Sequence, residues 1–268
     1  MKIIEKLDVS KNETHIKNDS SATDYSVYEM AVPEKIVYFI MGAGVLFCIA
    51  YVFYRSFLIS AVVSIFAVLY PSIRRKQIIV KRKKTLNLQF KDALYSLSSA
   101  VGSGSSVEMA LSDVLVDMEN QYGRKNILIV NELELMVSRL AVNWNVEDVF
   151  QDFAERSDLE DVRSFASIFS VSKRTGGNIV AIIRQSVQII AEKIEVEAEM
   201  DTLIAGKRME QKVLTAVPII LVFILTQLMG GFMEPIFTTA IGRVVSTVAL
   251  SFIVAGYFWS KKIIEFSI

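Results

Sequence analysis

Long apolar runs lie at both ends of this chain, with a polar and amphipathic stretch between them. The first pair of runs covers Ile36–Tyr54 and Phe57–Tyr70, and the second covers Val213–Met233 and Val244–Trp259. A helix of about 20 apolar residues crosses a hydrocarbon core. A helical pair buried inside a soluble domain would give such a pattern once, but not twice. We therefore predict four transmembrane helices in two hairpins, at about 36–54, 57–73, 213–233 and 242–260.

The predicted spans carry some local signals of their own. Only Arg55 and Ser56 separate the first two runs, which leaves room for a tight turn. Proline removes a backbone hydrogen bond inside a helix, so Pro218 predicts a kink in the third span. Gly230 and Gly231 indicate where that span ends. The hairpins are thus expected at 35–73 and 213–260.

Between the hairpins, apolar residues recur at helical spacing, and no segment alternates apolar and polar residues long enough for a strand. The pattern predicts an all-α domain over 74–212, a bundle of about six helices joined by short turns. The six stripes are Phe90, Leu94, Leu97 and Val101; Val107, Leu111, Val114 and Met118; Val130, Leu133, Val137 and Leu140; Val146, Val149, Phe150 and Phe153; Leu159, Val162, Phe165 and Phe169; and Ile183, Val187, Ile190 and Ile194.

Turn and cap signals separate these helices. Ser105 with Glu108 and Ser157 with Glu160 match the capping-box pattern, and Asn145 is a good N-cap residue. Glycines end the first and fifth helices at Gly102-Ser103-Gly104 and Gly176-Gly177-Asn178. The sixth helix begins at Ile179 and has only Gly206 as a breaker before Val213. It either continues into the third span or has a joint at that glycine.

The flanking charges predict an orientation. Basic residues cluster after the second span and recur before the third and after the fourth, whereas Arg55 and Arg243 alone lie at the opposite ends. By the positive-inside rule, the central domain, the polar and disordered tail at 1–34 and the tail at 261–268 all face the cytoplasm. We expect a multi-pass protein of the cell membrane. The cluster after the second span would set this topology and contact lipid headgroups: Arg74, Arg75, Lys76, Lys81, Arg82, Lys83 and Lys84.

The chain lacks the residues for common catalytic sites. Its one histidine, His15, and its one cysteine, Cys48, cannot form a Ser/His/Asp or Cys/His arrangement. Gly102-Ser103-Gly104-Ser105-Ser106 lacks the lysine and the preceding strand of a phosphate loop. The acidic positions between Glu192 and Asp201 are typical of a solvated helix face rather than a metal site. We therefore expect no enzyme activity, no cofactor, no metal and no nucleic-acid binding.

The order of several motifs resembles the type II secretion F-domain family, the platform proteins of type II secretion, type IV pilus and tight adherence pilus systems. The resemblance covers nearly everything after the N-terminal tail. Where the family commonly has a glycine, this chain has Asn143-Trp144-Asn145, and asparagine tolerates the same left-handed backbone. The matching segments are Phe90 to Leu94 with Val101 to Gly104, Val107 to Leu111, Val146 to Arg156, Lys173 to Asn178, Gly206 to Arg208 with Pro218, and Ile241 to Arg243.

With one such domain rather than two in tandem, the chain is most similar to the tight adherence proteins B and C. The resemblance implies a non-enzymatic scaffold that couples a cytoplasmic secretion ATPase to pilin-like subunits, beside a paralogous platform protein or another copy of itself. A component of a related secretion or sporulation channel is the alternative, and a small transporter is disfavoured because the spans lack interior charges. Candidate partner-docking residues are Gly102, Gly104, Lys173, Arg174, Gly176 and Gly177.

Overall fold

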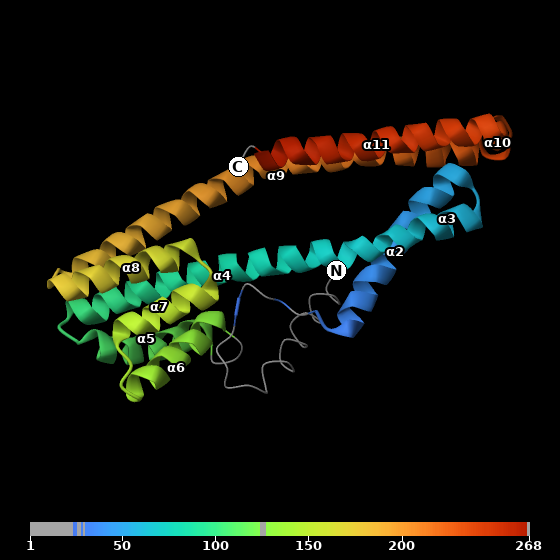
Figure 1. The fold of residues 1–268 in the computed structure, drawn as a ribbon. Coiled ribbons are helices and arrows are strands. Elements are labelled where there is room, and N and C mark those ends of the chain that lie inside the picture. Colours follow the sequence, from blue (N-terminus) through green and yellow to red (C-terminus); the bar gives the residue numbers. More distant parts are fainter. Residues whose placement is uncertain (1–23, 26–27, 29, 124–126, 267–268) are drawn as a thin grey trace. The chain divides into compact units, whose positions relative to one another are not determined.

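The structure, a computed structural model, describes residues 24–25, 28, 30–123 and 127–266 (Figure 1). All regular structure in these residues is helical, as the hydrophobic pattern predicted. The chain divides into two compact units. We call residues 77–194, with Asp24, Tyr25 and Tyr28, the core unit, and residues 30–76 and 195–266 the apolar unit. Most of the predicted tail, residues 1–23, 26–27 and 29, lies outside the described residues.

Six helices or parts of helices form the core unit. The C-terminal part of α4 (Tyr70–Gly102) is followed by α5 (Val107–Tyr122), α6 (Leu128–Ala141), α7 (Val146–Ser157), α8 (Glu160–Thr175) and the start of α9 (Ile179–Leu228). In Figure 1, α5 to α8 gather around the end of α4. All six predicted stripes contribute buried or partly buried side chains to one hydrophobic core. Among them, Phe90, Phe150, Phe153, Phe165 and Phe169 form a group of tilted and edge-to-face rings.

The turns of the core unit confirm some of the predicted signals and correct others. Gly176 ends α8 in the left-handed conformation, and Asn178 accepts a hydrogen bond from the N–H of Ala181. Asn143 also has a positive φ of 65°, as expected of a residue standing where glycine is common. Ser106, not Ser105, caps α5 by accepting from the N–H of Met109. The predicted box at Ser157 is wrong, because Ser157 is buried at the end of α7 and Leu159 precedes α8.

The apolar unit contains the ends of two helices shared with the core unit and several of its own. They are α2 (Val32–Tyr54), α3 (Phe57–Ser64), the 3-10 helix η1 (Ile65–Leu69), the start of α4, the end of α9, α10 (Gly230–Thr238) and α11 (Ala240–Phe266). Four helical stretches of the described residues are long and apolar enough to cross a membrane: 32–54, 57–102, 179–228 and 240–263. This supports a multi-pass membrane protein.

Several helix limits differ from the predicted spans. Pro33 fits the first turn of a helix, so α2 begins at Val32 rather than near Ile36. Helix α9 ends at Leu228, just before Gly230 and Gly231, as predicted, but a further helix, α10, begins at Gly230 and includes Glu234 and Pro235. Pro218 lies inside α9, which continues on both sides of it, so the kink stays a prediction.

The question left open about the sixth helix has an answer in α9. The helix runs from Ile179 to Leu228 through the acidic stretch and through Gly206 without interruption. One glycine inside a helix lowers its stability by only about 1 kcal/mol relative to alanine, so Gly206 alone is not enough to end α9. A helix that starts among the core residues therefore ends in an apolar stretch of membrane-spanning length.

Candidate functional site

Two turns that are far apart in the sequence lie at one end of the core unit. The first follows α4 and contains Gly102 and Gly104, and the second joins α8 to α9 and contains Gly176 and Gly177. A Cβ atom added to Gly102 would lie 3.5 Å from the guanidinium of Arg184 in α9. The Nζ atom of Lys173 in α8 lies 3.7 Å from Glu108 in the first turn of α5. We call residues 102–108 and 173–184 together the turn cluster.

Lys173 is held by carboxylates rather than left open to a partner. Its ammonium donates a 2.9 Å hydrogen bond to Glu147 in α7 and also pairs with Glu108. Burial alone would raise the pKa of Glu147, but the hydrogen bond and positive charge of Lys173 outweigh it and lower that pKa. Of the two basic residues predicted at this turn, Lys173 is therefore engaged in ion pairs within the protein, and these pairs join α8 to α5 and α7.

Arg174 and Arg184 supply the remaining positive charge of the turn cluster. The Arg174 guanidinium bonds to the carbonyl and hydroxyl oxygens of Ser170 on its own helix, at 3.3 and 3.0 Å. Both arginine side chains are exposed to solvent. A planar guanidinium presents several donors at fixed angles, which suits a carboxylate of a partner. The turn cluster therefore offers two exposed arginines, Arg174 from α8 and Arg184 from α9, separated in the sequence by Gly176 and Gly177.

The glycines of the turn cluster have distinct reasons to be glycine. Gly104 and Gly176 have φ values of 104° and 71°, in a region that side chains with a Cβ rarely adopt. Gly177 has no such φ, but a Cβ there would lie 2.2 Å from the hydroxyl oxygen of Ser172. These positions set the path of the chain between helices, and they bring the two arginines to the same end of the unit.

The predicted basic cluster is divided between the two units. Arg74 lies over the ring of Tyr38 in the apolar unit, 5.7 Å from its centroid. In the core unit, Arg82 lies over the rings of Tyr25 and Tyr28, at 5.9 and 5.6 Å. Lys83 donates a 2.6 Å hydrogen bond to Asp158, which lowers the pKa of that carboxyl. Part of this cluster thus contacts protein groups rather than lipid alone.

A buried ion network that no sequence pattern predicted fastens Tyr25 to α6 and α7. Glu132 in α6 is almost fully buried and receives two hydrogen bonds from the Arg156 guanidinium, of 2.9 and 2.6 Å. The Tyr25 hydroxyl donates to the same carboxylate at 2.7 Å, and the Tyr25 N–H donates to the Arg156 carbonyl at 3.0 Å. Burial, and then the Glu132 carboxylate, raise the pKa of Tyr25.

Asp152 extends this network at its outer side. It accepts a 2.7 Å hydrogen bond from Arg156 and forms an ion pair with Arg139, whose guanidinium lies 4.7 Å from the ring of Trp144. The signal in the sequence was Glu132 itself, a carboxylate on the same face as Ile129, Leu133 and Met136. Tyr25, in contrast, belongs to a stretch that was predicted to be a disordered tail, and it is buried in the core.

The described residues contain no group of three or more His, Cys, Asp or Glu side chains close enough to hold a metal ion. The acidic positions of α9 extend along the helix instead of converging. No family model, curated protein or solved structure matches the chain.

Proposed function

We propose that this chain is a non-enzymatic platform protein of a cell membrane. It would serve the assembly of a tight adherence or type IV-like pilus, or a type II secretion-like machine, by coupling a cytoplasmic secretion ATPase to pilin-like subunits. A paralogous platform protein or a second copy would stand beside it. The order of motifs that resembles the F-domain family motivates this function.

The proposed arrangement places the four apolar stretches in the membrane as two hairpins and the core unit, as a helical bundle, in the cytoplasm. Both termini would lie on the same side. The basic residues beside the apolar stretches support this orientation, because cytoplasmic flanks are enriched in Lys and Arg. The order of the helices agrees with it, since α4 leaves one apolar stretch and α9 enters another.

The observation that carries the proposal is the unbroken course of α9. Its first part contributes Ile183 and Ile190 to the hydrophobic core, and its last part is one of the four candidate spans. A helix transmits displacement along its axis better than a loop does, because each turn is hydrogen-bonded to the next. A motor that acts on the core unit would thus act on a membrane helix without a flexible connection between them.

The turn cluster is the proposed docking site for the ATPase. Arg174 and Arg184 are exposed there, and the glycine turns hold two helix junctions at the same end of the unit. Acidic side chains of the ATPase would pair with these arginines, and such complementary charges mainly affect the rate and specificity of association.

Capture from mild detergent tests this function in cells that make such a pilus. The full-length tagged chain is expected to retain the secretion ATPase and a pilin. The double variant Arg174→Glu/Arg184→Glu should lose the ATPase and keep the pilin. Arg163→Glu is a matched control, because Arg163 is an exposed arginine in the first turn of the same helix, α8. Capture of neither partner by the unmodified chain would overturn the proposal.

A further inference from the structure

A pocket of about 490 Å³ lies in the apolar unit, where the first turns of α2 approach the junction of η1 and α4. A volume in this range is typical of ligand sites. Both helices that form it belong to candidate membrane spans. We call it the interface pocket, and its lining residues are Met30, Val32, Lys35, Ile36, Phe39, Val68, Pro71, Ser72 and Arg75.

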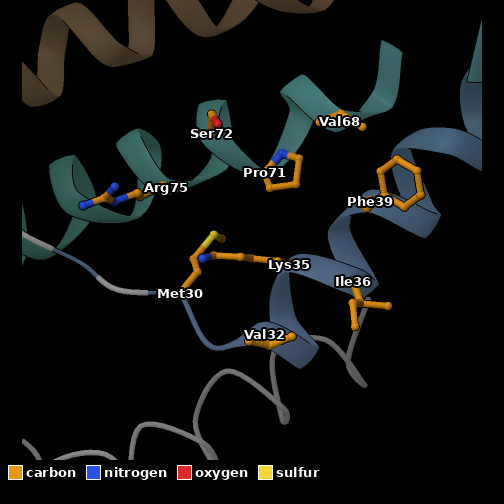
Figure 2. A pocket seen from close by; sticks show the side chains of 9 residues that line it. All are labelled: Met30, Val32, Lys35, Ile36, Phe39, Val68, Pro71, Ser72 and Arg75. Carbon is orange, nitrogen blue, oxygen red and sulfur yellow. The ribbon is translucent and has the colours of Figure 1, made fainter. Parts of the chain in front are cut away.

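The polar and apolar side chains of the interface pocket are segregated. Figure 2 shows Lys35 extending from α2 toward Met30, at the end of the pocket where Ser72 and Arg75 lie. Ile36, Phe39 and Val68 lie toward the other end. The pocket therefore offers two positive charges and a hydroxyl group at one end, and hydrocarbon at the other.

Neighbouring contacts fix the distance between the two walls. The rings of Tyr38 in α2 and Tyr70 in α4 pack 6.5 Å apart, and the Arg74 guanidinium lies over the Tyr38 ring. Gly42 allows this approach, because a Cβ there would lie only 3.2 Å from the Tyr70 ring. Residues one turn apart share a helix face. Tyr38 and Gly42, with Tyr70 and Arg74, thus form the joint, while Lys35 and Phe39, with Pro71 and Arg75, face the pocket beside it.

The positions of the lining residues along α2, η1 and α4 place the polar end of the pocket at the membrane surface and the apolar end deeper in the bilayer. Lys35 lies in the first turns of α2, and Arg75 follows the last apolar residues of the second candidate span, so both belong at the same membrane surface. Phe39 lies one turn further into α2, and Val68 precedes Arg75 by about two turns, so the apolar end is the deeper one. The pocket would open at the headgroup level, with its hydrocarbon end below.

We propose that the interface pocket binds an anionic phospholipid. The phosphate diester contacts Lys35, Arg75 and the Ser72 hydroxyl, and an acyl chain lies along Ile36, Phe39 and Val68. Basic pockets between membrane helices on the cytoplasmic side recognise such headgroups. A free phosphate ion would use only the polar end and leave the hydrocarbon end in contact with water. The site would hold α2 and the start of α4 in one arrangement while the platform is under load, and in this respect it rests on the proposed function.

Lipid binding to the full chain in a neutral detergent tests the site by native mass spectrometry. The unmodified chain is expected to retain one phosphatidylglycerol in preference to phosphatidylcholine. Lys35→Gln/Arg75→Gln should weaken phosphatidylglycerol binding about 30-fold, since each basic side chain near a headgroup contributes about a factor of five. Lys35→Arg/Arg75→Lys should keep the preference, because both positive charges of the pocket remain.

The matched control is Lys76→Gln/Lys81→Gln, which removes two exposed charges of the same basic cluster that do not line the pocket. It should bind phosphatidylglycerol like the unmodified chain. Equal losses in the two double variants, or equal binding of both lipids by the unmodified chain, would overturn the site.

Displacement of the lipid by an equal concentration of glycerol 3-phosphate would also overturn it, because the acyl chain would then add nothing. A chain that fails to capture the ATPase but retains selective lipid binding refutes the proposed function and leaves the lipid site standing.

Discussion

The core unit and the apolar unit are both helical, but the apolar unit leaves far more of its large apolar side chains exposed. In the core unit, Phe153 is fully buried among other phenylalanines, whereas in the apolar unit Phe252 is 74% exposed and Ser60 is fully buried. Water drives large apolar groups inward. Lipid does not, so small polar residues can take the inside of membrane helices. The difference indicates that the two units are solvated by water and by lipid, respectively.

The sharpest test of this difference removes a phenylalanine ring from each unit. Phe153→Ala should lower the free energy of unfolding of the core unit by about 3–5 kcal/mol, because it opens a cavity beside Phe90. Phe252→Ala leaves no cavity and should lower the free energy of unfolding of the apolar unit by less than about 1 kcal/mol. In detergent, Trp144 fluorescence in a Trp259→Phe background reports the unfolding of the core unit, and Trp259 fluorescence in a Trp144→Phe background reports that of the apolar unit. Equal losses would show that Phe252 is packed inward as Phe153 is.

A second test concerns the buried charge of the core unit, Glu132. Glu132→Ala should destabilise the core unit by about 3–5 kcal/mol, because the Arg156 guanidinium loses its buried partner. Tyr25→Phe removes one hydrogen bond to a charged group and should cost about 1.5–3 kcal/mol. The same fluorescence assay measures both. If Tyr25→Phe has no effect, then the Tyr25 hydroxyl does not donate to Glu132 as described.

Adding a charge to an exposed position should be costly in the apolar unit and harmless in the core unit. Leu221→Arg, on an exposed face of the apolar part of α9, should reduce membrane integration by about 2.5–3.5 kcal/mol. Val116→Arg, on an equally exposed face of α5, should be neutral, since water already surrounds that side chain. Alkaline extraction of membranes measures the integrated fraction. Normal integration of Leu221→Arg would argue against a lipid-facing position.

The smallest expected effect is a pH dependence confined to the core unit. Burial, and then the hydrogen bond to Asp92, raise the pKa of Tyr122 to about 12. Its stabilising contribution is therefore complete below the unfolded pKa of about 10 and is lost as the pH rises from 10 to 12. Tyr122→Phe should flatten the decline of stability in that window. An unchanged slope would mean that Tyr122 is not buried against Asp92.

The sequence predicted the core better than the sites. Every hydrophobic stripe reached the core, because helical periodicity is a local property of the chain. The buried network was missed because Tyr25 and Glu132 are 107 residues apart, and no local pattern connects them. The N-cap of α5 was predicted one residue too early, at Ser105 instead of Ser106, because two adjacent serines can each serve as a cap. The interface pocket arises only when α2 and α4 pack, so Lys35 alone gave no signal.

The central claim, that one unbroken helix joins the water-solvated unit to the lipid-solvated one, is tested most directly by a spin-label distance along α9. Labels at Ile189 in the core unit and Leu214 in the apolar unit are both exposed, and a Cys48→Ser background removes the chain's only cysteine. Across these 25 residues a continuous helix predicts a narrow distribution near 38 Å, at about 1.5 Å per residue. A broad distribution with shorter distances, which Gly206→Ala narrows, would reveal a joint at Gly206 and contradict the account.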